Sequence, residues 1–88
     1  MAEKQKIGEV FTYFSKIGVA GIRIIEGSLS IGDRISIEGH TTNFEQSVDS
    51  MEIDRNPVEK VEAGQEVGIK VRERVRPRDV VYKVLGES

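Results

Sequence analysis

The aliphatic side chains of this 88-residue chain are almost all β-branched: there are 10 isoleucines and 11 valines, against 2 leucines and 3 alanines. β-branched side chains lose rotamer freedom in a helix and pack well on a pleated surface, whereas leucine and alanine favour helices. Nine glycines recur at strand-length intervals, and no stretch places apolar residues at the spacing of an amphipathic helix. The sequence therefore predicts an all-β fold.

Alternation of apolar and polar residues places the strands. It is strict at residues 35–38 and 67–72, which gives each of these stretches one buried and one solvent-facing side. Residues 28–30 read as a connector, and residues 58–61 as an ambiguous apolar step after the break at Pro57. Six strands are expected, at residues 6–14, 19–25, 34–38, 44–53, 66–74 and 80–85.

A chain of this length forms one domain, which we expect to span residues 1–88 with a flexible N-terminus at residues 1–5. Six short strands separated by turn signals fit a barrel better than a sandwich at this size. Closure removes exposed strand edges, and isoleucine and valine can fill a narrow interior without disulfides. We therefore predict a small closed six-stranded antiparallel β-barrel.

Several function classes are disfavoured by composition. The chain has no cysteine, a single histidine and no phosphate-binding P-loop motif, so we expect no enzyme activity, no metal, no cofactor and no nucleotide bound by this chain alone. No apolar run is long enough for a membrane span and the N-terminus lacks a secretory signal, so we expect a cytoplasmic protein without membrane contact. The net charge of -2 disfavours coating of nucleic acid by bulk charge, but not a local basic patch.

Such a patch is indicated near the C-terminus, where a basic residue occupies every second position from 70 to 78. On an extended chain these side chains share one face, and at about 3.3 Å per residue they form a ridge on the order of 25 Å long. The ridge could follow a phosphate backbone, with arginines gripping oxygens in pairs. The alternative is a solvated strand face neutralised by neighbouring glutamates. The five residues are Lys70, Arg72, Arg74, Arg76 and Arg78.

Aromatic residues cluster at the end of the first expected strand. Phe11 and Tyr13 share a parity and should project to one face, and Phe14 to the other. One face would be core; the other could stack on a base or an aminoacyl group, or dock a partner protein together with the loop of His40. Lys16 lies beside the cluster and is a further candidate for RNA contact.

Seven segments of the chain are similar to known proteins. The first four are residues 19–27, 28–37, 61–69 and 78–82, which together resemble the second domain of translational GTPases such as elongation factor Tu and initiation factor two. The other three are residues 13–20, 39–44 and 48–51, which give a closer resemblance to small translation-factor-like barrels, including barrels appended to collagenase-like peptidases. The resemblance covers residues 7–85, without a counterpart of the GTPase domain.

This resemblance implies a translation-protein type of barrel that contacts ribosomal RNA or the acceptor end of transfer RNA, and no GTP hydrolysis. Arg23 matches the family's arginine in the second strand and is a further candidate for RNA contact, and Glu66 stands where elongation factor Tu has an asparagine at its aminoacyl pocket. We therefore expect a non-catalytic module that contacts RNA through a basic strand face. The alternative is a protein-interaction barrel that docks onto a separate enzyme or translation factor.

Overall fold

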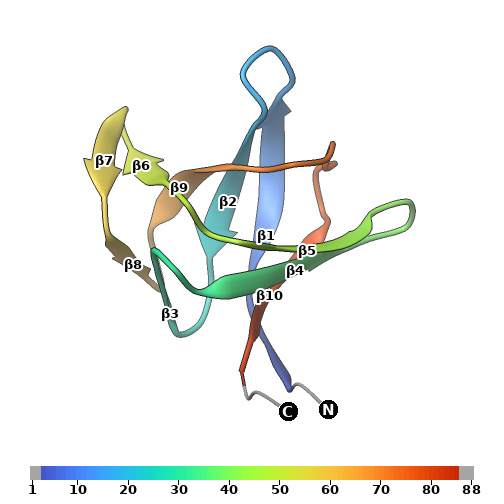
Figure 1. The fold of residues 1–88 in the computed structure, drawn as a ribbon, viewed down its shortest axis with the longest axis horizontal. Helices are drawn as coiled ribbons and strands as arrows, with labels where there is room; N and C mark the ends of the chain where they lie inside the picture. The colour runs from blue at the N-terminus through green and yellow to red at the C-terminus, as the bar shows by residue number, and fades with distance from the viewer. Residues whose placement is uncertain (1–2, 86–88) are drawn as a thin grey trace.

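The computed structural model describes residues 3–85, which form ten strands and, among these residues, no helix that could cross a membrane. The all-β prediction is confirmed, and every ladder is antiparallel. Eight strands form one twisted sheet in the order β5-β4-β10-β1-β2-β9-β6-β7, and β3 pairs with β8 (Figure 1). The strands are β1 (Lys4–Phe14), β2 (Val19–Ile24), β3 (Ser28–Ser30), β4 (Arg34–Glu38), β5 (Asn43–Ser47), β6 (Met51–Ile53), β7 (Asn56–Val58), β8 (Lys60–Glu62), β9 (Glu66–Lys70) and β10 (Val80–Val84).

The predicted closure of the barrel is not found, because neither sheet closes on itself. The edges of the large sheet are β5 and β7. A side chain, without a backbone ladder, joins β5 to the chain that leaves β9. The buried Gln46 amide donates to the carbonyl of Lys70 and accepts from the N–H of Arg72, both at 2.8 Å.

Several expected strand boundaries also change. The long strand expected at 44–53 is divided into β5 and β6, and the strand expected at 66–74 ends at Lys70. The connector at 28–30 is a strand, and the ambiguous step at 58–61 falls in the β7–β8 region. Of the N-terminus expected to be flexible, residues 1–2 lie outside the described part, while Lys4 and Gln5 already pair with β10.

The core consists mainly of isoleucine and valine, as the composition predicts. Ile22, Ile35, Ile37, Ile69 and Val81 are fully buried, and the described part has no buried side-chain polar atom without a hydrogen-bond partner. β-branched side chains fill this interior from strands that wrap around it. Several large apolar side chains, among them Phe11, Phe14 and Ile17, lie outside this core and are exposed.

Candidate functional site

A β-bulge in β1 decides which way the aromatic residues point. The register with β2 shifts between Val10 and Thr12, so Phe11 is an extra residue and the alternation reverses beyond it. Phe11 and Phe14 are 42% and 52% exposed, whereas Tyr13 packs against the core. The predicted pairing of Phe11 with Tyr13 on one face is therefore wrong, because a single inserted residue exchanges the two faces of a strand.

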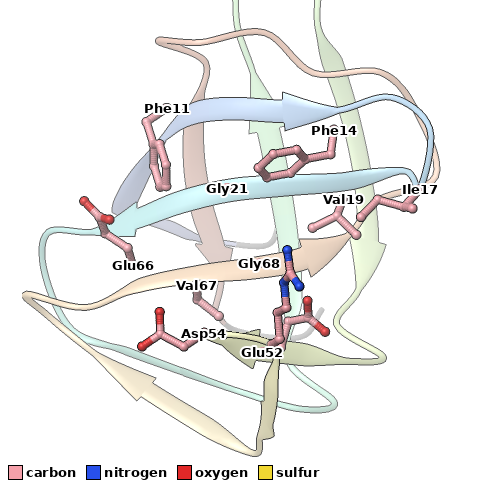
Figure 2. Close-up of a pocket in the computed structure, with 11 residues that line it drawn as sticks. Phe11, Phe14, Ile17, Val19, Gly21, Glu52, Asp54, Glu66, Val67 and Gly68 are labelled. Atoms are coloured by element: carbon pink, nitrogen blue, oxygen red, sulfur yellow. The ribbon is translucent and has the colours of Figure 1, made fainter.

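The two exposed phenylalanines line an outer groove of about 370 Å³, which we call the aromatic groove. Figure 2 shows the rings of Phe11 and Phe14 along one side, and the carboxylates of Glu52 and Asp54 on the side facing them. The groove crosses β1, β2 and β9 and reaches the β6–β7 turn. Its lining residues are Phe11, Phe14, Ile17, Val19, Gly21, Glu52, Asp54, Arg55, Glu66, Val67 and Gly68.

Two glycines leave the floor of the aromatic groove without side chains. Gly21 of β2 and Gly68 of β9 are direct cross-strand partners. A Cβ at Gly21 would lie 2.6 Å from Cγ2 of Thr12 and 3.0 Å from Cζ of Phe11, and a Cβ at Gly68 would lie 3.2 Å from Cγ1 of Val19. Glycine is required at position 21 because neighbouring side chains occupy the space.

Charged side chains surround the aromatic groove. Arg23 lies over the ring of Phe11, with its guanidinium carbon 5.7 Å from the ring centre, and donates to the carboxylate of Glu66 at 2.7 Å. Asp54 and Arg55 form the two-residue turn between β6 and β7, both with positive φ, at 50° and 67°. This is the conformation of a type I′ turn, where asparagine and glycine are favoured. Arg23, a predicted RNA contact, is therefore already engaged by Glu66 and Phe11.

The five basic residues at 70–78, called the basic segment from here on, lie mostly beyond the end of β9. All five are exposed, while Val71 and Val75 are buried. The buried positions are four residues apart, so the segment does not form the straight extended ridge expected from the sequence. A turn bends it at Pro77, where the N–H of Asp79 donates to the carbonyl of Arg76 at 3.0 Å.

No side chain of the basic segment forms an ion pair within residues 3–85. Seven ion pairs within residues 3–85 engage six of the chain's 13 lysines and arginines, and none of the six belongs to the basic segment. Lys16 is also exposed and takes part in no ion pair within that range. Its turn lies beside the segment, because the N–H of Val71 donates to the carbonyl of Gly18 at 2.9 Å.

The start of the basic segment borders a second hollow, of about 440 Å³. Arg34, Lys70 and Arg72 line it together with two carboxylates, Glu45 and Asp49. Glu45 pairs with Arg34 at 3.0 Å, and its backbone carbonyl accepts from Nη2 of Arg72 at 3.1 Å. Arg72 thus holds β5 in addition to presenting a charge, whereas no such bond is found for the side chains of Arg74 and Arg76 within residues 3–85.

The other predicted docking residue, His40, is exposed in the turn between β4 and β5 and does not line the aromatic groove. Within residues 3–85 no three histidine, aspartate or glutamate side chains are placed to hold a metal ion. Sequence reasoning missed the groove's acidic side and its glycine floor. Mid-strand glycines are a signal of close approach, but their pairing requires the register.

Comparison with known proteins agrees with this architecture. Two Porphyromonas gingivalis proteins named collagenase are 42% and 44% identical over 82 and 85 residues, and a Methanocaldococcus jannaschii protein named an uncharacterized protease is 41% identical over 80. These matches cover at least 90% of this chain, but the chain spans only about a fifth of the relatives' lengths, 19% to 23%.

Among solved structures, the C-terminal domain of a Geobacillus thermoleovorans protein assigned to the U32 peptidases superposes with a TM-score of 0.83 at 22% identity, covering 90% of this chain and 91% of that one. Its selenomethionine form gives a TM-score of 0.81 at 21% identity, over 88% and 96%. At these identities the likeness shows the fold. The family model of elongation factor Tu domain 2 matches residues 18–74, more than half of the sequence, and the chain therefore belongs to the elongation factor Tu domain 2 family.

Proposed function

We propose that this chain is a non-catalytic RNA-binding module of the cytoplasm, whose basic segment contacts the phosphate backbone of ribosomal or transfer RNA. The observation that carries the proposal is that all five basic side chains of this segment are exposed, and that none forms an ion pair within residues 3–85. By contrast, six of the other eight lysines and arginines form ion pairs within the same range.

Counterion release is the physical reason why an exposed basic segment would bind RNA. A lysine or arginine that neutralises a phosphate displaces a condensed cation, and this favours binding whatever the sequence of the RNA. Four of the five residues are arginines, whose guanidinium groups can donate two hydrogen bonds to one phosphate. Bulk charge would not provide this attraction, because the net charge is -2.

The proposal is consistent with the family. The resemblance to translational GTPases implies contact with ribosomal RNA or the acceptor end of transfer RNA. The relatives named collagenase and protease are about five times as long as the matched region. We propose that any peptidase activity of those proteins belongs to the rest of their chains, and that the shared domain binds.

The test is a binding titration of fluorescently labelled, unfractionated transfer RNA with this 88-residue chain. The variant Arg74→Ala/Arg76→Ala avoids Arg72, which also bonds to β5. We expect its affinity to fall roughly tenfold or more, because two phosphate contacts are lost. Phosphate contacts strengthen binding to all sequences alike, so the loss should be seen with unfractionated transfer RNA. The control, Lys6→Ala/Lys60→Ala, removes the same charge from two ion-paired lysines and should change affinity much less.

Equal losses in the two variants would mean that only net charge matters and would contradict a role for the basic segment. Absence of binding by the unmodified chain at low salt would contradict the proposal altogether. Circular dichroism of each variant should remain that of the unmodified chain, since all four replaced side chains are exposed.

A further inference from the structure

Half of the exposed large apolar side chains in the described residues gather in the aromatic groove. Six such side chains are exposed, and three of them, Phe11, Phe14 and Ile17, line this one groove. Single exposed apolar residues are ordinary, but a concave group of them marks a binding surface. A volume of about 370 Å³ is at the small end of ligand sites, where one or two bulky side chains fit.

The shape of the groove depends on two residues whose backbone conformations are strained and are not needed to close the hairpin. Asp54 and Arg55 hold left-handed backbone conformations, and both side chains line the groove. A turn such as Asp-Gly would close the same hairpin with less strain. Residues that keep such conformations cluster at functional sites. The glycine floor, in turn, lets a ligand approach the backbone of β2 and β9 closely.

The charges around the groove favour a ligand that carries positive charge. Its lining holds three carboxylates, of which that of Glu66 is paired with Arg23, so Glu52 and Asp54 face one guanidinium, that of Arg55. Arg23 occupies the ring of Phe11, but within residues 3–85 no cation lies over the ring of Phe14. A phosphate backbone would be repelled here, whereas a lysine or arginine could pair with a carboxylate and lie against the Phe14 ring.

From these features we infer that the aromatic groove docks a partner protein, through a segment that combines a bulky apolar anchor with lysine or arginine. The apolar anchor fills the space between Phe14, Ile17 and Val19 above the glycine floor. The flanking basic side chains face Glu52 and Asp54. Figure 2 shows these two acids on the side of the groove opposite the phenyl rings, so one short segment can reach both.

This inference does not depend on the proposed RNA contact, because the groove and the basic segment share no residue. Either can fail while the other holds. The probes are a blocked hexapeptide of alternating leucine and arginine, the same peptide with glutamate in place of arginine, and adenosine monophosphate as a free nucleobase.

Each probe is titrated into the ¹⁵N-labelled chain and followed by NMR. The basic peptide should shift the amides of Gly21 and Gly68, and the acidic peptide should bind at least about tenfold more weakly. The matched pair Ile17→Ala and Ile31→Ala removes an exposed isoleucine inside and outside the groove, respectively. Only Ile17→Ala should weaken the basic peptide, by about fivefold or more. Glu52→Gln/Asp54→Asn should reduce the preference for the basic peptide.

Several results would overturn the inference. The first is equal binding of the acidic and basic peptides, and the second is equal effects of the two isoleucine variants. The third is a groove whose amides respond to adenosine monophosphate and not to the basic peptide, which would make it a site for an RNA base. Absence of saturable shifts with the basic peptide at millimolar concentration also counts against docking.

Discussion

Arg78 occupies the turn position where glycine is the favoured residue. The turn runs from Arg76 to Asp79 with Pro77 second and Arg78 third, and Arg78 has a φ of 81°. This is the pattern of a type II turn, whose third residue requires positive φ. The buried carboxylate of Asp79 fixes the turn by accepting from the N–H of Arg76 at 2.9 Å. A strained arginine at this position is consistent with a binding role for its guanidinium group.

We therefore expect Arg78→Gly to separate stability from binding. Relief of a left-handed conformation, worth about 1–2 kcal/mol, is partly offset by the greater freedom of glycine in the unfolded chain. The free energy of unfolding in urea should be unchanged or up to ~1 kcal/mol higher, while affinity for transfer RNA falls. A clear loss of stability, or unchanged RNA affinity, would contradict the role given to Arg78.

Gly21 is constrained by the space around it and not by its backbone conformation, because its φ lies outside the left-handed region. Gly21→Ala would place a Cβ 2.6 Å from Cγ2 of Thr12, and we expect a loss of roughly 1–3 kcal/mol in the free energy of unfolding, as for other overpacked sites. Gly68→Ala should cost less, because its nearest contact is 3.2 Å away. Thr12→Ser removes the clashing methyl group and should recover part of the Gly21→Ala loss. Additive effects of the two changes in urea unfolding would show that the contact is not the cause.

At the scale of elements, the sequence predicted the strands better than their register. Composition and alternation placed β2, β4 and β10 well, because side chains along a regular strand alternate between its two faces with a period of two residues. The bulge at Phe11 carries no comparable sequence signal, and one extra residue exchanged the faces of Tyr13 and Phe14. For the same reason the sequence located the aromatic cluster but not the groove, whose acidic side comes from the distant β6–β7 hairpin.

The bridge between β5 and the chain beyond β9 rests on Gln46. Gln46→Ala removes both bonds of a buried amide to the backbone, and we expect the free energy of unfolding to fall by about 1–3 kcal/mol. Hydrogen exchange at the Arg72 amide should accelerate, because Gln46 is its acceptor. Gln65→Ala, which removes one bond in an exposed turn, is the control and should cost less. Equal losses would argue that the bridge does not hold the sheet edge.

Lys4 of β1 and Glu38 of β4 join two strands that flank β10. The hydrogen bond from Lys4, at 2.7 Å, and that from Ser36 lower the pKa of the Glu38 carboxyl, and the same pairing raises the pKa of Lys4. The contribution of Glu38 to stability is thus present above the unfolded carboxyl pKa and is lost as pH falls through the lower folded value.

Glu38→Gln should therefore be less stable than the unmodified chain at pH 7, and the difference should disappear in acid. The contribution of Lys4 persists at neutral pH and is lost only as pH rises through its raised pKa. Urea unfolding from pH 3 to 8 measures the difference. A gap between the two proteins that stays constant down to the lowest pH would contradict the pairing.

At the scale of the whole molecule, two surfaces differ in the charges they leave unpaired, although the net charge is small. The basic segment lacks ion pairs within residues 3–85, while the aromatic groove is lined by three carboxylates and one guanidinium, that of Arg55. The sequence predicted the five basic residues because they are close together along the chain. It could not show whether glutamates neutralise them, because that depends on which strands become neighbours. Two binding surfaces of different chemistry are the consequence we propose.

The most direct test of the RNA contact is the salt dependence of affinity for a 20-nucleotide oligouridine. The logarithm of the binding constant should fall linearly with the logarithm of the salt concentration. On single-stranded RNA, removing one phosphate-binding side chain should reduce the slope by about 0.7, so that Arg74→Ala/Arg76→Ala flattens it by roughly 1.4. A slope near zero for the unmodified chain, or the same slope in this variant, would contradict a basic segment that binds phosphates.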